Sequence, residues 1–432
     1  MNRYFKISAF AIVATGLLAC MSCGQAKDDQ PFRFIVISDT HFGKTDAMGK
    51  VTQTLQCLLN KEPMADAVFV VGDITNNGLP EQYEQAAAVF SDTTFVPAGV
   101  AVYLLGGNNH DNQNNGYEII SKILKQPMNQ YIEIKGYPFI TISEGGHHYG
   151  NPDSIEYNRT AKAFLAENLA HAAKKFPGKP IFVFMHVPPE NTCYGSLHSE
   201  GWGTPYFSEV MNQYPQIVVF GGHSHYPVGD PRSINQDIFT SINDGSCTYS
   251  EVAPGEVSMG VHPENYTNVT EGLIVNVMSD RSLQIERWDT YRNEEILPVW
   301  VVEAPHDGSR FTYKGRTGLP EPVFNTGEQV SVSDAASDSC VVAFAQATDE
   351  ENVFRYKIDI LRSFGKDVAA TPTVTWYLFS QFYLNSDTPS ALSAVIHGLS
   401  PGVRYVARVT ALDSYNNASQ PIESEPFIVK KK

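Results

Sequence analysis

Cysteine and positive charge are both scarce in this sequence. Lys and Arg total 31 against 47 Asp and Glu, which gives a formal net charge of −16. Apart from the terminal Lys430, Lys431 and Lys432 there is no basic run, and an acidic surface repels polyanions. We therefore expect no long nucleic acid among the partners.

The cysteines beyond the first 23 residues are too widely spaced to form a thiolate zinc site. They are Cys57, Cys193, Cys247 and Cys340. Cys193 and Cys247 both fall in expected loops, where export from the cell would permit a disulfide. Their connectivity cannot be read from the sequence, so the question stays open at this point.

Long apolar runs and low-complexity tracts are also missing from most of the chain. Hydrophobic residues make up 42% and charged residues 18% of the 432, which is typical of a folded protein with two or three domains. The one marked apolar run, Ile7 to Ala19, follows Arg3 and Lys6 and is too short to span a bilayer. This pattern predicts a signal peptide.

The end of that run resembles the lipobox of bacterial lipoproteins. It reads Leu17-Leu18-Ala19-Cys20-Met21-Ser22-Cys23, and a polar acidic segment follows Cys23. The resemblance implies a lipoprotein signal peptide over residues 1–22, cleaved before Cys20 or Cys23, and an exported protein held to the cell envelope by an N-terminal lipid anchor. An ordinary cleaved signal is the alternative, and the face of the membrane is left open.

After the leader, short apolar runs alternate with helical stretches in an α/β rhythm. Helices are expected over Pro80 to Phe90 and Tyr157 to Phe176. The expected strands are Phe34 to Ile37, Ala67 to Val71, Val100 to Leu105, Phe139 to Ile142, Ile181 to Phe184 and Ile217 to Phe220. From Ile238 the helical signal fades, and the β-type segments up to Val302 are expected to complete a second sheet.

A Gly- and Pro-rich stretch divides the chain near its last quarter. We predict a first domain over residues 31–303, a linker over 304–322 and an all-β sandwich over 323–432. The segment Gly398 to Val409, which contains Ser400-Pro401-Gly402 and Tyr405, resembles a fibronectin type III domain around its tyrosine corner. No charged cluster there indicates chemistry, so a spacer or substrate-presenting role is favoured.

Polar signatures directly follow the expected strands. Because the carboxyl ends of neighbouring strands in an α/β sheet converge on one crevice, residues far apart in sequence should meet there. Each signature alone is more often a helix cap, a turn or a solvated histidine, and only their combination reverses those odds. They are Ser38-Asp39-Thr40-His41, Gly72-Asp73, Gly107-Asn108-Asn109-His110-Asp111, Met185-His186 and Gly222-His223-Ser224-His225.

Carboxylate, carboxamide and imidazole groups in these signatures suit zinc, manganese, iron or cobalt, and no thiolate takes part. Two such ions lie ~3.5–4 Å apart in two-metal hydrolases and need an anionic bridge between them. Asp73 is the natural bridge.

The order of the signatures resembles the calcineurin-like metallophosphoesterase superfamily. The likeness covers roughly Pro31 to Val302 and implies a two-sheet α/β sandwich flanked by helices, ahead of the fibronectin type III-like sandwich. It assigns Asp73 to both of two metal ions. It assigns Asp39, His41 and His225 to the first ion, and Asn109, His186 and His223 to the second.

The same resemblance implies a catalytic role for His110, as the general acid that protonates the leaving oxygen, and for Asp111, which orients its ring. A metal-bridging hydroxide would attack phosphorus. The usual signature has one asparagine before the histidine, whereas this chain has two. Asn109 is taken as the ligand because it adjoins His110. If the loop is shifted, Asn108 takes that place.

Comparison with branches of the superfamily favours phosphodiesterases. Asn76 stands where purple acid phosphatases have a metal-binding tyrosine, and the arginine of protein Ser/Thr phosphatases is missing after Asp73. The pattern is nearest to the group that includes bacterial cyclic-nucleotide and other phosphodiesterases. Substrate choice is expected in the loop Pro189 to Thr204, which contains Tyr194, His198 and Trp202, although a simple lid is as good an interpretation.

The leading hypothesis is an enzyme, a binuclear metallophosphoesterase that hydrolyses small or surface-displayed phosphomonoesters or phosphodiesters. The rival is a cell-surface binding protein built on a degenerate phosphoesterase scaffold. The complete ligand set together with His110 argues for the enzyme.

Overall fold

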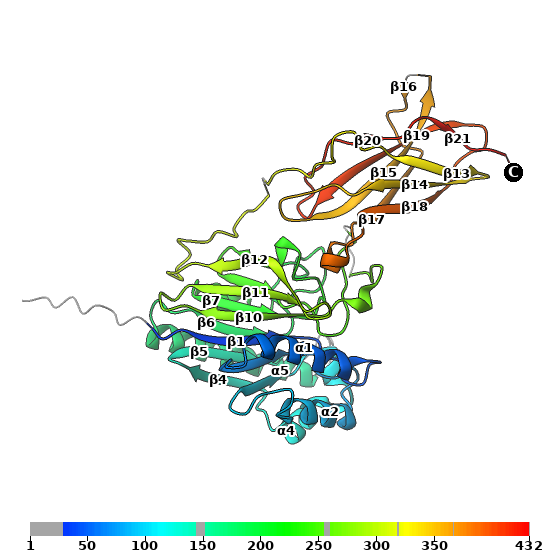
Figure 1. Ribbon diagram of the computed structural model, residues 1–432. Helices are drawn as coiled ribbons and strands as arrows, with labels where there is room; N and C mark the ends of the chain where they lie inside the picture. Colours follow the sequence, from blue (N-terminus) through cyan, green and yellow to red (C-terminus); the bar gives the residue numbers. More distant parts are fainter. Residues whose placement is uncertain (1–28, 144–151, 255–259, 318, 366, 432) are drawn as a thin grey trace, which may run out of the picture.

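A computed structural model describes residues 29–143, 152–254, 260–317, 319–365 and 367–431 of the chain. The expected signal peptide over residues 1–22, with Cys20 and Cys23, lies outside the described residues. Two parts are visible in Figure 1, an α/β body and an all-β lobe.

The first sheet of the α/β body contains the strand that leads into the first signature. Its parallel strands are rich in Val, Ile and Phe, residues that pack well on a pleated surface. In spatial order the sheet is β12 (Glu294–Val302), β11 (Leu283–Asp289), β10 (Glu271–Val277), β1 (Phe32–Ile37), β2 (Ala67–Val71) and β3 (Ala101–Leu105).

The second sheet faces the first. Four of its strands, β5, β6, β7 and β9, run parallel, and the two edge strands are antiparallel. Its order is β4 (Asn129–Ile134), β5 (Tyr137–Ile142), β6 (Ile181–Met185), β7 (Ile217–Gly221), β9 (Thr240–Asn243) and β8 (Ile234–Gln236).

Phenylalanine rings fill the space between the two sheets. Phe34 of β1 is fully buried and lies 5.0 Å from Phe182 of β6, and Phe69 of β2 stacks on Phe184 at 4.0 Å between ring centroids. Burial of each such ring contributes roughly 1.5–3 kcal/mol. This aromatic core fixes the two sheets against each other, and thereby the strand ends that carry the signatures.

Helices cover the outer faces of both sheets, so the body has four layers. Apolar side chains of α1 (Ala47–Lys61), α2 (Pro80–Ser91) and α4 (Gly116–Ile123) pack on the first sheet. Those of α5 (Pro152–Lys175) and α6 (Ser208–Met211) pack on the second. The predicted class, a two-sheet α/β sandwich flanked by helices, is confirmed.

The segments after Ile238 differ in part from the expectation that they complete the second sheet. Only β9 joins that sheet, whereas β10, β11 and β12 extend the first sheet beside β1 in antiparallel order. β11 and β12 each follow a short turn and pair with the strand before them, whereas β10 pairs with β1, far away in the sequence. The hydrophobic pattern predicts strands but not their partners.

The C-terminal part is all-β, as predicted. Buried side chains of its two sheets form a separate core, which contains Tyr356 and Tyr405. The Tyr405 hydroxyl accepts a hydrogen bond from the Ser400 amide at 3.1 Å, as in a tyrosine corner. One sheet contains β13 (Ser331–Ala336), β14 (Ser339–Ala345) and β18 (Ala391–His397); the other contains β15 (Val353–Phe364), β16 (Asp367–Val368), β17 (Val374–Phe379), β19 (Arg404–Asp413), β20 (Ile422–Glu423) and β21 (Phe427–Ile428).

The lobe is docked on loops of the α/β body. The orange segment after β17 in Figure 1, η4 (Phe382–Asp387), reaches down to the body. Buried apolar side chains from both parts form one cluster there, and polar contacts surround it. The cluster contains Tyr194, Tyr226, Val252, Ala253 and Val269 from the body, and Phe354, Tyr383 and Leu384 from the lobe.

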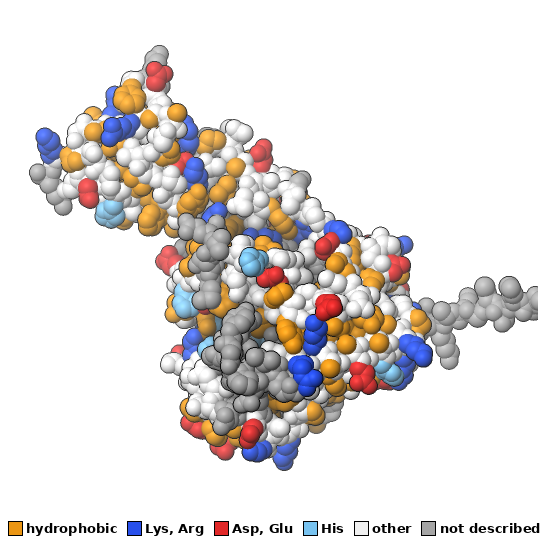
Figure 2. All heavy atoms as spheres, turned by 180° about the vertical axis from the view of Figure 1, so that it is seen from behind, with side chains coloured by type: hydrophobic (Ala, Val, Ile, Leu, Met, Phe, Trp, Pro, Cys, Tyr) orange, Lys and Arg blue, Asp and Glu red, His pale blue; other side chains and the backbone are white. Residues whose placement is uncertain are grey.

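Within the described residues no helix is long and apolar enough to cross a membrane. Cys57, Cys193, Cys247 and Cys340 are all buried and free, so the disulfide considered between Cys193 and Cys247 does not form. On the face shown in Figure 2, Lys and Arg side chains are scattered among acidic and apolar ones and form no basic stripe.

Candidate metal centre

The carboxyl ends of five strands from both sheets deliver polar side chains to one buried place. The residues that meet there all follow directly on a strand, as the sequence predicts. They are Asp39 and His41 after β1, Asp73 after β2, Asn108 after β3, His186 after β6, and His223 and His225 after β7.

Two groups of potential ligand atoms share one carboxylate. Asp39, His41, Asp73 and His225 form the first group, and Asp73, His186 and His223 form the second, with ligand atoms within 4.8 Å of one another in each. All six are buried except His223, which is half-buried. Asp73 belongs to both groups, which is the arrangement that two neighbouring cations need.

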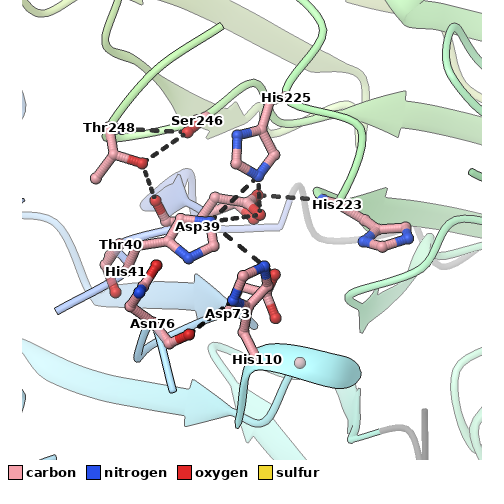
Figure 3. Close-up of polar contacts among 12 residues, drawn as sticks. Asp39, Thr40, His41, Asp73, Asn76, His110, His223, His225, Ser246 and Thr248 are labelled. Atoms are coloured by element: carbon pink, nitrogen blue, oxygen red, sulfur yellow. Dashed lines mark hydrogen bonds and ion pairs between the residues drawn. The ribbon is translucent and has the colours of Figure 1, made fainter. Parts of the chain in front are cut away.

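The first group is centred on Asp39, as Figure 3 shows. His225 Nε2 lies 2.9 Å from Asp39 Oδ1 and 3.2 Å from His41 Nε2. The other oxygen, Oδ2, accepts hydrogen bonds from the Ser38 hydroxyl at 2.5 Å and from the His223 amide at 3.1 Å. One carboxylate oxygen is therefore fixed by the protein and the other faces the cluster.

The second group is oriented in the same manner. His186 Nδ1 donates to the Val71 carbonyl at 2.9 Å, which turns Nε2 toward Asp73 Oδ2 at 3.2 Å. Asp73 Oδ1 is buried and forms no hydrogen bond with any described residue, and His186 Nε2 and Asp39 Oδ1 meet only other candidate ligand atoms. Buried atoms of this kind are costly unless they coordinate a metal. The donor set thus fits a binuclear site, although it does not identify the metals.

The backbone at the site is held in the left-handed region at several ligand positions. Asp39, His41, Asp73, His223 and His225 all have φ between 41° and 69°. L-residues adopt this conformation rarely, and clusters of it occur where function requires a particular side-chain direction. Each of these residues follows a strand end, so the unusual φ turns its side chain inward.

Glycines allow these loops to approach one another. A Cβ at Gly107 would lie 2.2 Å from Asp73 Oδ1, and one at Gly222 would lie 1.8 Å from Ser38 Oγ. Any side chain at either position would push the ligand loops apart.

The charges of the cluster call for a cation. Burial opposes the ionisation of Asp39, but the His225 and His186 imidazoles outweigh it and lower its pKa to about 2. Burial likewise opposes ionisation of Asp73, and His186 lowers that pKa as well. Although burial disfavours the imidazolium of His186, the carboxylates of Asp73 and Asp39 raise its pKa to about 10. Both carboxylates therefore stay ionised, and without a metal a histidine proton offsets their charge.

His110 lies against the first group. Its ring centroid is 4.7 Å from that of His41 in an edge contact. His110 Nδ1 lies 2.8 Å from the Asn76 carbonyl oxygen, as Figure 3 shows. A carbonyl only accepts, so Nδ1 carries a proton, and Nε2 is the nitrogen left for proton transfer.

Asp111 has a different task from the expected one. Its carboxylate accepts hydrogen bonds from the backbone amides of Ile74, Thr75 and Gly107 at 2.8–2.9 Å. Among the described contacts it does not touch the His110 ring, which the Asn76 carbonyl orients instead. Asp111 is fully buried, and it fastens the loop after β2 to the loop after β3. Burial and the nearby Asp73 carboxylate raise its pKa.

The two asparagines before His110 lie at different places. Asn108 is fully buried, and its Nδ2 is 3.3 Å from His223 Nε2. Asn109 is the first residue of α3 (Asn109–Asn112), and its side chain is not among those that the structure describes. Asn108, the alternative that the sequence left open, is thus the amide seen beside the second group.

Several side chains near the site were not expected from the sequence. Tyr249 lies 4.1 Å from His225 between ring centroids, and Lys44 lies over Tyr249. Asp244 is fully buried with neither oxygen hydrogen-bonded to a described residue, and burial raises its pKa well above the usual range. None of them belongs to a short signature. From the loop Pro189 to Thr204, the Trp202 ring lies edge-on at 4.9 Å from His223.

A carboxylate shared by two ligand groups is an arrangement that two-metal hydrolases use. Residues 32–227 match the model of the calcineurin-like phosphoesterase family. Residues 32–227 of the α/β body are therefore similar to a calcineurin-like phosphoesterase domain, and all-β sheets follow the body.

Bacterial relatives with phosphodiesterase names are similar to this chain at low identity. A probable glycerophosphodiester phosphodiesterase of Arcobacter nitrofigilis is 25% identical over 207 residues, which cover 44% of this chain and 71% of the relative. A probable cyclic nucleotide phosphodiesterase of Rhodococcus erythropolis is 25% identical, with 48% and 69% covered. A glycerophosphodiester phosphodiesterase of Enterobacter lignolyticus is 28% identical, with 44% and 69% covered.

Solved structures show a more distant likeness. GAP50, the anchor in the inner membrane complex of Plasmodium, superposes with a TM-score of 0.46 at 12% identity, covering 67% of this chain and 92% of that one. A purple acid phosphatase from yellow lupin gives a TM-score of 0.43 at 13% identity, with 64% and 54% covered. Likeness at this level carries no information about activity.

Proposed function

We propose that the protein hydrolyses phosphodiesters of small alcohols with two metal ions, and that His110 acts as general acid. The observation that carries the proposal is the pair of buried ligand groups that share Asp73. The phosphodiesterase names of the bacterial relatives support a diester over a monoester.

The chain's own residues suit this chemistry. Asp39, His41 and His225 would hold one ion, Asn108 or Asn109 with His186 and His223 the other, and Asp73 both. When bound, such ions lower the pKa of water and neutralise phosphate oxygens.

An alkoxide leaving group needs a proton near neutral pH, and this proton is the part of the reaction that the protein supplies. His110 lies at the edge of the first ligand group with its Nδ1 proton engaged by the Asn76 carbonyl. In the imidazolium form, its Nε2–H would donate to the leaving oxygen.

The test is hydrolysis of bis-p-nitrophenyl phosphate and p-nitrophenyl phosphate by the purified chain loaded with Mn²⁺ or Zn²⁺. We expect turnover of the diester and a lower kcat/KM for the monoester. Asp73→Asn should abolish both activities and reduce bound metal from two ions to one or none. A protein with two bound ions and no turnover of either ester would contradict the proposal.

The alternative hypothesis, a cell-surface binding protein on a degenerate phosphoesterase scaffold, predicts a different result. In that case His110→Ala would leave any turnover unchanged, and deletion of the lobe would abolish ligand capture. The buried, oriented side chains of both ligand groups favour the enzyme, with only His223 half-buried among the six.

We further propose that the chain is an exported lipoprotein, on the evidence of the apolar run and the two cysteines near the start of the sequence. When the chain is labelled with palmitate in a bacterial host, one of the two variants Cys20→Ser and Cys23→Ser should lose the label. The other variant should keep it. A wild-type chain that takes up no palmitate would contradict the anchor.

A further inference from the structure

Lys44 lies beside the metal centre and has no part in the chemistry proposed above. It stands three residues after His41, and its amide donates to the His41 carbonyl at 3.0 Å in a tight turn. The turn contains Gly43 at φ 99°, where a Cβ would lie 2.0 Å from the Gln82 side chain. The position of Lys44 is therefore fixed relative to the ligand His41.

The Tyr249 ring is a common neighbour of Lys44 and of two metal-ligand candidates, His41 and His225. Lys44 Nζ is 3.4 Å from the centroid of the Tyr249 ring. That ring is 4.1 Å from the His225 ring and 5.8 Å from the His41 ring. Tyr249 thus contacts both the Lys44 ammonium group, in a cation–π contact, and the His225 ring of the first ligand group.

Among the described residues, Lys44 forms no ion pair. Glu251, a carboxylate whose charge acts on Lys44, lies 3.3 Å from His262 Nε2. The neighbouring Lys50 donates to the carbonyls of Thr248 and Thr267 at 2.5 and 2.6 Å. Within the described residues the Tyr249 ring is therefore the side-chain partner of this half-buried ammonium group, and no described carboxylate pairs with it.

The segment that presents Tyr249 and His262 is held from two sides. Lys50 of α1 fastens its ends, at Thr248 and Thr267. The lobe holds the segment near its second end, where the Tyr383 hydroxyl donates to the Glu264 carbonyl at 3.0 Å and the Gln381 amide donates to the Glu264 carboxylate at 3.1 Å. These contacts attach the described residues at both ends of the segment to the body and to the lobe.

We propose that Lys44 and Tyr249 form an anion subsite that takes a second acidic group of the substrate, a carboxylate or a phosphate on the alcohol of the ester. The carboxylate of Glu251 is in contact with His262 at 3.3 Å. The inference rests on the proposed function and narrows its substrate class to phosphate esters that carry a further negative charge. Neutral or cationic alcohols would gain nothing from this subsite.

The experiment compares binding of 3-phosphonopropionate and ethylphosphonate to the metal-loaded chain by calorimetry. The two ligands share the phosphonate, and only the first has a carboxylate. We expect the wild type to prefer 3-phosphonopropionate by about tenfold, close to 1.4 kcal/mol. Lys44→Gln should lose the preference by weakening that ligand alone, and Lys44→Arg should keep it.

Lys122→Gln, an exposed lysine of α4, is the matched control for overall charge and should keep the preference. No preference in the wild type, or a preference that survives in Lys44→Gln, would overturn the subsite. Equal weakening of both ligands in Lys44→Gln would also overturn it, since that indicates a structural role. Turnover of bis-p-nitrophenyl phosphate is measured on the same preparations. No turnover would count against the proposed hydrolase activity, whereas the binding preference alone decides whether the anion subsite exists.

Discussion

At the scale of single residues, the doubled asparagine is the point where sequence pattern and geometry diverge. Adjacency to His110 favours Asn109, whereas the structure brings the buried Asn108 to His223. We expect Asn108→Ala to lose the ion of the second group, with bound metal falling from two ions to one. Asn109→Ala should keep both. Metal analysis after gel filtration measures this, and the reverse outcome would assign the ligand to Asn109.

A second residue-scale prediction concerns the proton donor. His110→Gln keeps a polar side chain beside the Asn76 carbonyl but cannot protonate a leaving oxygen. For a methyl ester we expect kcat to fall by about 10² to 10⁴, the usual worth of a general acid. For a p-nitrophenyl ester, whose leaving group needs no proton, the fall should be smaller than about tenfold.

The leaving-group dependence is what distinguishes this role from a structural one. If both esters lost activity equally, His110 would only support the ligand loops. Bound metal, measured in the same samples, should be unchanged in His110→Gln.

At the scale of secondary-structure elements, the sequence predicts most of what positions the site. Runs such as Ala67 to Val71 and Ile181 to Phe184 are fully buried strands, and each polar signature follows one of them. Strand pairing could not be predicted in the same way, because β10 pairs with β1, which lies far from it in the sequence. The hydrogen bonds of Asp111 could not be predicted either, because a sequence motif does not show which backbone amides a carboxylate binds.

One buried carboxyl in β10 gives the fold a pH dependence. Glu271 is almost fully buried, Oε2 accepts from the Val228 amide at 3.0 Å, and Oε1 has no described partner. Burial raises its pKa to about 8, and Asp289 adds to this. A folded-state pKa above the unfolded value gives stability that is complete below about pH 4.5. This stability is lost as the pH rises to about 8.

We therefore expect the free energy of unfolding of the metal-free chain to decline between pH 5 and 8, with this group contributing up to about 1.4 kcal/mol per pH unit. Glu271→Gln keeps the acceptor for Val228 and cannot ionise, so it should flatten that decline. Urea unfolding at several pH values measures it, with the exposed Glu425→Gln as control. An unchanged slope in Glu271→Gln would show that Glu271 is not the titrating group.

At the scale of the whole molecule, the junction between body and lobe links stability to the site. Tyr194 and Tyr226 of the body share a buried cluster with Phe354 and Tyr383 of the lobe. Around it, Arg292 pairs with Asp387 at 2.8 Å and the Arg355 guanidinium donates to the Pro254 carbonyl at 2.8 Å. An apolar interface with polar contacts around it favours unfolding of the two parts as one unit.

Tyr383→Ala tests this coupling, because Tyr383 is buried in the shared cluster and its hydroxyl binds the Glu264 carbonyl. Loss of the ring should cost about 3–5 kcal/mol of contact between the parts. We expect calorimetry to show one thermal transition in the wild type and two in this variant. Added Mn²⁺ should raise the midpoint temperature of the body's transition and leave that of the lobe unchanged.

Two further variants separate loss of the junction from loss of stability in general. Tyr383→Phe removes only the hydroxyl bond, worth about 1 kcal/mol, and should keep a single transition. Val409→Ala destabilises the core of the lobe without touching the junction, and it too should leave the parts coupled. A single transition in Tyr383→Ala, merely shifted as in Val409→Ala, would contradict the coupling. Because Glu264 lies on the segment that presents His262, uncoupling should also raise KM more than it lowers kcat.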